Sequence, residues 1–153
     1  MMTEVTEVPR QNGGLRLKDD SYWVASETSC YYVDNTRTQR MSDAREKCKE
    51  MGGDLAIIRS ANENQFIFDL VTKTRGIPKH WGVWIGLQRK ADGNFQWVDG
   101  SPLEYNKWYP GEPNDTGGRE DCGHMGTSGG GWNDSPCDWE VKPAFVCKMP
   151  IRG

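Results

Sequence analysis

The stretch GEPNDTGGREDCGHMGTSGGGWNDSPC, residues 111–137, is the part of this 153-residue chain that indicates its fold. It is rich in Gly and in oxygen-bearing side chains, and it contains two of the five Cys. From Glu112 to Asp138 the chain has six carboxylates against a single base, Arg119. A local excess of carboxylates in a Gly-rich segment repels nucleic acid and favours the binding of a cation. We therefore expect a loop that is held in place and functional.

The oxygen-bearing residues of this stretch form a candidate calcium site. Carboxylates and Asn carbonyls make an all-oxygen set, which suits a hard ion with about six to eight ligands. Ligands on a loop match the flexible coordination of calcium better than the octahedron of magnesium. Zinc is not expected, because the chain has two His and no Cys-x-x-Cys pair. The candidates lie in Glu112-Pro113-Asn114, Glu120-Asp121-Cys122 and Trp132-Asn133-Asp134.

Length and composition indicate one loop-rich domain. Mean hydropathy is −0.79, yet 7 Trp, 5 Tyr and 4 Phe supply large side chains for a core. With 18 Gly and 8 Pro the core should be modest and should need extra fastening. No basic stripe favours nucleic acid, and no apolar run approaches the roughly 18 residues of a membrane span.

Local signals predict two helices and several short strands. The first helix is expected to be capped by Ser42 or Asp43 and to end at Gly52. The second is expected to start with the capping box at 60–63 and to end near Gly76. Apolar and aromatic runs predict strands at 22–25, 30–33, 83–87, 95–98 and 144–147.

The Cys residues stand at positions 30, 48, 122, 137 and 147. An odd number in a small Trp-rich domain predicts two disulfides and one remaining thiol. Spacing alone does not choose among the pairings. A Cys122–Cys137 bridge would close the Gly-rich loop at its base, and a Cys48–Cys147 bridge would tie the first helix to the last strand. Reduced, buried thiols in a cytosolic protein are the other alternative.

The chain resembles the C-type lectin-like domain. The resemblance extends from Tyr22 to Lys148 and rests on Gly53-Asp54-Leu55-Ala56, Trp84-Ile85-Gly86-Leu87, Trp97-Val98-Asp99-Gly100, Trp108, Glu112-Pro113-Asn114, Trp132-Asn133-Asp134 and the last four Cys. It implies an α+β double-loop fold with two helices, two small antiparallel sheets and a long Gly/Pro-rich loop. The implied bridges are Cys48–Cys147 and Cys122–Cys137, with Cys30 free or paired between chains. The domain would span 21–149, between a flexible arm or linker at 1–20 and a tail at 150–153.

The resemblance also implies a ligand set. The primary calcium ligands would be Glu112, Asn114, Glu120, Asn133 and Asp134, with a cis bond before Pro113. The vicinal hydroxyls of a sugar would ligate the ion directly, while the same side chains hydrogen-bond those hydroxyls. Glu-Pro-Asn in this place goes with mannose-type sugars (mannose, fucose and N-acetylglucosamine). A second calcium site would use Asp92, Asp115 and Asp121, although Arg89 stands where an acid is expected.

We therefore expect a calcium-dependent lectin, secreted or forming the ectodomain of a membrane protein, with mannose-type glycans as partners. The alternative is a protein-interaction domain in which calcium only stabilises the loops. An enzyme is not expected. Calcium ligation would leave neither Glu112 nor Glu120 free to transfer a proton as a glycosidase requires.

Overall fold

The computed structural model describes residues 5–6, 14–17, 22–77 and 82–151. This part of the chain contains two α-helices, a short 3₁₀ turn and ten strands. In chain order these are β1 (Val5–Thr6), β2 (Gly14–Leu17), β3 (Tyr22–Ser26), β4 (Ser29–Asp34), α1 (Met41–Glu50), β5 (Asp54–Leu55), α2 (Ala61–Lys73), β6 (Val83–Arg89), β7 (Phe95–Trp97), η1 (Thr116–Gly118), β8 (Cys122–Met125), β9 (Trp132–Ser135) and β10 (Ala144–Pro150). The expected α+β class is confirmed.

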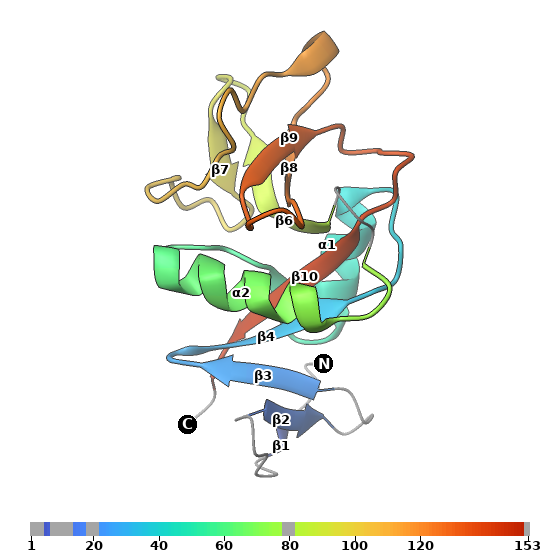
Figure 1. Cartoon of the computed structure of the whole chain (residues 1–153), viewed down its shortest axis with the longest axis vertical. Helices are drawn as coiled ribbons and strands as arrows, with labels where there is room; N and C mark the ends of the chain where they lie inside the picture. Colours follow the sequence, from blue (N-terminus) through green and yellow to red (C-terminus); the bar gives the residue numbers. More distant parts are fainter. Residues whose placement is uncertain (1–4, 7–13, 18–21, 78–81, 152–153) are drawn as a thin grey trace.

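The strands form a base and an upper part, with the helices between them (Figure 1). In the base, β3 and β4, both predicted as strands, form a hairpin, and β10 pairs antiparallel with β4 and with β5. In the upper part, β6 pairs antiparallel with β7 and β8, and β8 pairs with β9. A short parallel ladder between β10 and β6 joins the two parts, with Ala144 opposite Val83. The two expected antiparallel sheets are thus linked into one network.

Several boundaries differ from the sequence-based predictions. Helix α1 begins at Met41, ahead of the predicted caps, and its N-cap Arg40 makes no side-chain capping bond. The reason is tertiary, because the Met41 amide donates to the Cys137 carbonyl at 2.9 Å. Helix α2 begins as predicted, with the Glu63 amide donating to Ser60 Oγ at 3.1 Å.

Two segments expected to lack regular structure contain strands. Within the expected flexible arm at 1–20, β2 pairs antiparallel with β3, and the rest of that arm apart from β1 lies outside the described residues. The stretch 111–137, which was expected to form a loop, contains β8 and β9. Of the expected tail at 150–153, Pro150 ends β10, the Ile151 amide donates to Thr28 O at 3.0 Å, and the rest lies outside the described residues.

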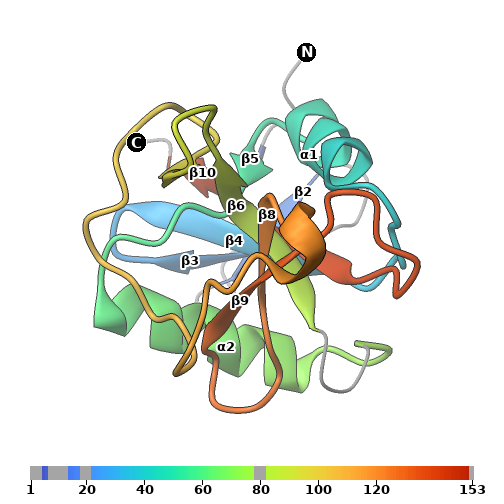
Figure 2. The same cartoon turned by 90° about the horizontal axis from the view of Figure 1, so that it is seen from above.

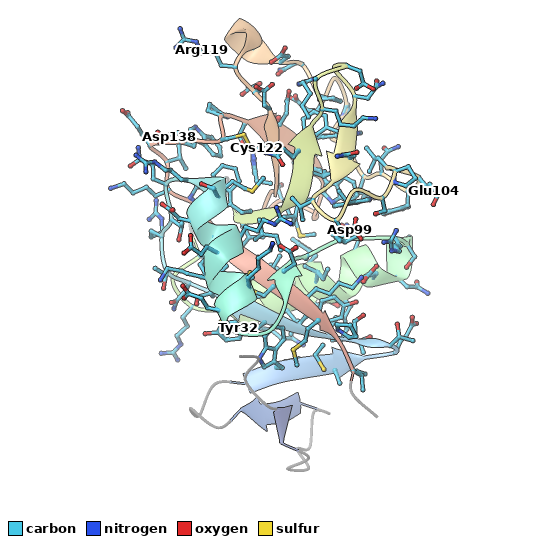
Figure 3. The ribbon with its side chains drawn as sticks, turned by 180° about the vertical axis from the view of Figure 1, so that it is seen from behind. Tyr32, Asp99, Glu104, Arg119, Cys122 and Asp138 are labelled. Carbon is cyan, nitrogen blue, oxygen red and sulfur yellow. A yellow bond between two sulfur atoms is a disulfide. The ribbon has the colours of Figure 1, made fainter. Side chains whose placement is uncertain are left out.

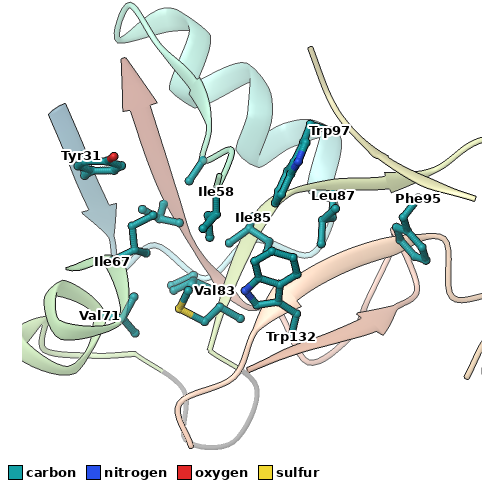
Figure 4. Packing of buried hydrophobic residues seen from close by; sticks show 14 residues of the cluster. Tyr31, Ile58, Ile67, Val71, Val83, Ile85, Leu87, Phe95, Trp97 and Trp132 are labelled. Atoms are coloured by element: carbon teal, nitrogen blue, oxygen red, sulfur yellow. The ribbon is translucent and has the colours of Figure 1, made fainter. Parts of the chain in front are cut away.

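Two hydrophobic clusters support this arrangement. Figure 4 shows the larger one, in which Ile67 of α2 faces Ile85 of β6 and Trp132 of β9. The second surrounds the Cys48–Cys147 bridge and includes Trp84 and Phe145. Trp84 and Trp132 are each 0% exposed, so both contribute to packing rather than to a surface. Among the described residues no helix is long and apolar enough to cross a membrane.

Both disulfides implied by the resemblance are present. Cys48 and Cys147 are 99 residues apart in sequence, and Cys122 and Cys137 are 15 apart. Bridges closing loops of these lengths stabilise the fold by about 4.7 and about 3 kcal/mol in the chain-entropy account. Cys30 is unpaired and fully buried on β4, and burial raises the pKa of its thiol. Its burial does not fit a bridge to another chain.

Candidate metal centre

The candidate ligands come from a strand and from a loop. Asn133 and Asp134 lie on β9, which β8 holds in register with Gly123 opposite Asp134. Glu112, Asn114 and Glu120 lie on the segment that precedes β8 and contains η1. Figure 1 shows η1 at the end of the molecule opposite β1–β3, and Figure 2, seen from above, shows the segment in front of the rest of the fold.

Backbone hydrogen bonds fasten the loop to β9. The Tyr109 amide donates to Trp132 O at 2.9 Å, and the Trp132 amide donates to Lys107 O at 2.8 Å. Tyr109 also donates its hydroxyl to Ser128 O at 2.5 Å. These bonds secure the loop just before Glu112, whose amide donates to Tyr109 O at 2.9 Å. The prediction of a loop held in place is borne out by these contacts.

Asp134 is the central acceptor of the site. Its side chain is 0% exposed. Asp134 Oδ1 accepts from the Asn114 amide at 3.2 Å, and Oδ2 accepts from the Asp115 amide at 2.8 Å. One buried carboxylate on β9 therefore fixes the backbone of the loop at the predicted ligands.

Glu112 and Asn114 lie side by side across Pro113. The peptide bond before Pro113 is cis, as the resemblance implied. Glu112 Oε2 accepts from Asn114 Nδ2 at 3.3 Å, and Oε1 accepts from the Asn114 amide at 3.1 Å. Asn114 is exposed and Glu112 half-buried. A hydrogen-bond acceptor and a donor are thus presented together at the surface.

Glu120 closes the other side of the loop. Its Oε1 accepts from the Thr116 amide at 2.9 Å, and its amide donates to Asp115 Oδ1 at 3.0 Å. Asn114 Oδ1 accepts from the Thr116 hydroxyl at 2.9 Å. Asp115 has a left-handed backbone with φ of 48°, which turns the chain between Asn114 and Thr116.

The electrostatics of the site favour a cation. Burial raises the pKa of Glu112, and the neighbouring Asp134 carboxylate raises it further. Burial also raises the pKa of Glu120, again with a contribution from the charge of Asp134. The base Arg119 is exposed and lies at the outer end of the loop (Figure 3). A cation among Glu112, Glu120 and Asp134 would relieve this repulsion, so the oxygen donors fit calcium.

The site is not a closed metal cluster as it stands. Within the described ranges no three His, Cys, Asp or Glu side chains converge as a ready-made metal site. The carboxylates accept hydrogen bonds from backbone amides instead, so an ion would replace some of these bonds. Asn133 is half-buried beside Asp134 on β9.

The residues considered for a second calcium site separate into two groups. Asp92 forms an ion pair with Lys90 at 3.2 Å and accepts from the Asn94 amide at 2.9 Å. Asp115 and Asp121 instead lie around the Arg89 guanidinium, at 3.8 and 3.1 Å. A positively charged side chain therefore lies between Asp115 and Asp121, and Asp92 is paired with a different base.

One residue that supports the site was missed in the sequence. Asn64 of α2 is buried, accepts from Trp132 Nε1 at 2.8 Å and donates to Gly130 O at 3.0 Å. It shares the buried face of α2 with Ile67 and Val71. A polar residue in line with an apolar face was the signal that could have found it.

Residues 37–149 match the family profile described as the lectin C-type domain. The chain is a C-type lectin domain. The domain is 36% identical over 154 residues to human C-type lectin domain family 4 member G, and the match covers 94% of the chain and 49% of that relative. It is 40% identical over 126 residues to the human low affinity immunoglobulin epsilon Fc receptor, covering 82% of the chain and 36% of the receptor. This C-type lectin domain therefore spans half or less of these relatives.

Among solved structures, the domain is similar to the cow C-type carbohydrate-recognition domain of CD23, determined in the presence of a GlcNAc2Man3 oligosaccharide. The TM-score is 0.73 at 34% identity, and the match covers 86% of this chain and 95% of the cow domain. The likeness supports the fold of this C-type lectin domain over most of its length.

Proposed function

We propose that this domain binds mannose-type sugars through a calcium ion held by Glu112, Asn114, Glu120, Asn133 and Asp134. The observation that carries the proposal is the pair formed by Glu112 and Asn114, whose carboxylate and amide meet at 3.3 Å at the surface of an acidic site. A bound calcium would supply a positive centre that accepts oxygen ligands from both the protein and a sugar.

Glu112 and Asn114 would play different hydrogen-bonding roles in sugar recognition. When it is ionised, the Glu112 carboxylate can accept hydrogen bonds but cannot donate them, whereas the Asn114 amide donates through Nδ2. One sugar hydroxyl would donate to Glu112, and its neighbour would accept from Asn114. This order of acceptor and donor around the ion would distinguish sugars by the arrangement of neighbouring hydroxyls. The mannose class is supported by the similar cow CD23 domain, whose structure was determined in the presence of a mannose-containing oligosaccharide.

Exchanging the two roles tests the proposal. The double variant Glu112→Gln with Asn114→Asp keeps the number of oxygen ligands and the total charge but reverses acceptor and donor. Glu104 and Asn106 have the same spacing and are exposed in the same loop, so Glu104→Gln with Asn106→Asp is a matched control. Figure 3 shows Glu104 well away from Arg119.

Binding should be measured on mannose and galactose surfaces, with calcium and with chelator. A single site is expected to be weak, about millimolar, so the domain must be displayed in several copies. We expect chelator to abolish mannose binding. The 112/114 exchange should keep calcium binding, weaken mannose binding about tenfold or more, and shift preference towards galactose. Mannose binding that survives chelator, or an exchanged variant that behaves like the 104/106 control, would overturn the proposal.

A second candidate function is binding to a protein, with calcium only stabilising the loops. The relative at 40% identity is named as an immunoglobulin epsilon Fc receptor, which favours a protein partner for that protein. The glycan measurement separates sugar binding from protein binding. If the domain binds neither sugar surface in the presence of calcium, the result favours protein binding. For either function we propose a location outside the cell, since two disulfides persist in an oxidising compartment.

A further inference from the structure

The Arg89 guanidinium lies within the acidic end of the domain and uses most of its hydrogen-bonding capacity there. Nε donates to Asp121 Oδ1 at 3.1 Å, and Nη1 donates to Gly93 O at 2.9 Å. Nη2 donates to Glu120 O at 3.0 Å and to Asp134 Oδ2 at 3.3 Å, and it is 3.8 Å from Asp115 Oδ1. Three carboxylates and two carbonyls thus surround one positive charge.

The surroundings of Arg89 distinguish it from an exposed surface ion pair. Its side chain is 17% exposed and lies over the ring of Phe95, with Cζ 4.5 Å from the ring centroid. Its backbone amide donates to Asp121 O at 2.7 Å, which fixes the end of β6 against the loop. Packing and backbone bonding therefore hold the guanidinium in one place.

The position of Arg89 matters because it places a positive charge next to the buried Asp134 carboxylate. A carboxylate that is 0% exposed needs a positive partner or several hydrogen bonds, because an unpaired buried charge is costly. Asp134 has both, since two loop amides donate to it and Arg89 supplies a charge. The same Asp134 is one of the proposed calcium ligands, so whatever fixes it also fixes the site.

We propose that Arg89 is an internal cation that takes the place of a second calcium ion and holds Asp134 in position for the first. Arg89 is a positioning residue, and the domain should bind one calcium ion per chain. This inference rests on the proposed function, because it concerns the same site. It differs from that proposal by predicting a preformed loop without a second ion.

The first test is the number of calcium ions bound per unmodified chain, measured by calcium titration calorimetry and by native mass spectrometry. One ion is expected. Two ions would overturn this inference and leave the proposed function standing. No bound ion would overturn the proposed function itself, so the two failures are distinguishable.

The second test compares Arg89→Met with Lys90→Met. Both variants remove one positive charge, but Lys90 is exposed and pairs with Asp92. In chelator, Arg89→Met should lower the melting temperature by roughly 6–12 °C relative to Lys90→Met, because buried Asp134 loses its charged partner. Equal melting temperatures would overturn the inference.

Calcium affinity separates positioning from simple charge repulsion. Removing a neighbouring positive charge should by itself tighten calcium binding, as we expect slightly for Lys90→Met. Arg89→Met should instead weaken binding about tenfold, because Asp134 is no longer held. Arg89→Lys, which keeps the charge but loses the planar fork, should recover part of the affinity. Tighter calcium binding in Arg89→Met would contradict the positioning role.

Discussion

Replacing Asn64 by Ala should destabilise the domain far more than any other Asn→Ala change on helix α2. Asn64 is 4% exposed and makes two hydrogen bonds, from Trp132 Nε1 and to Gly130 O. Truncation leaves an indole N–H and a carbonyl without partners, at about 1–3 kcal/mol each. The expected loss is therefore about 2–6 kcal/mol of unfolding free energy. For a domain of this size that lowers the melting temperature by roughly 4–24 °C.

Asn62 supplies the control, because it is on the same helix and exposed. Asn62→Ala should change the unfolding free energy by less than about 0.5 kcal/mol. Urea denaturation of both variants, followed by Trp fluorescence, measures the difference directly. If Asn64→Ala unfolds at the same urea concentration as Asn62→Ala, the two buried hydrogen bonds do not stabilise β9 as argued. An intermediate result of about 1 kcal/mol would mean that water replaces the lost amide.

The ion site, a buried His and the free thiol can each be tested separately. Calcium at about a hundred times its Kd should stabilise the fold by about 2.7 kcal/mol, and an unchanged melting temperature on adding calcium after chelator would contradict the ion site. Burial lowers the pKa of His124 to about 4, so the unfolded chain binds a proton first and stability should fall as pH drops from about 6.5 towards 4. His124→Gln should flatten that fall in denaturation curves at pH 7 and pH 4.5; an equally steep fall would count against it. Cys30 should not react with a thiol reagent in the native protein and should react once the chain unfolds in urea without reductant, whereas rapid native labelling would show that the thiol is accessible.

Local sequence patterns predicted the elements whose determinants are local. The Ser60 and Glu63 pair marked the start of α2 because the capping bond joins residues three apart. The start of α1 could not be found in the same way, since its first amide is satisfied by Cys137, far along the chain. The turn residues of the long loop gave no sign of what would fasten it, because every one of these bonds to β9 uses a backbone atom of the loop, whether its partner is the backbone of Trp132 or the side chain of Asp134.

Strands β8 and β9 were missed because their residues are poor strand formers. The sequence Cys122-Gly123-His124-Met125 pairs with Trp132-Asn133-Asp134-Ser135 because β6 provides a template and a disulfide closes the pair. The primary candidate ligands follow from a family resemblance, and hydrogen bonds through Asn114 and Asp115 link four of the five, Glu112, Asn114, Glu120 and Asp134, into one network. The sequence showed that Arg89 stands where an acid is expected. Three of its four side-chain hydrogen bonds could not be predicted, because they join segments that only the fold brings together.

The parallel ladder between β6 and β10 has a consequence for how such a domain can change. The chain leaves the base at Val83 and returns at Ala144, and these two residues are partners in the ladder. The segment between them is therefore an insert whose two ends lie next to each other. The insert contains the Cys122–Cys137 bridge, and the Cys48–Cys147 bridge lies in the rest of the domain. Evolution or an engineer could exchange this cassette between relatives and alter what is recognised, provided that Ile85, Leu87 and Trp132 still fill the shared core.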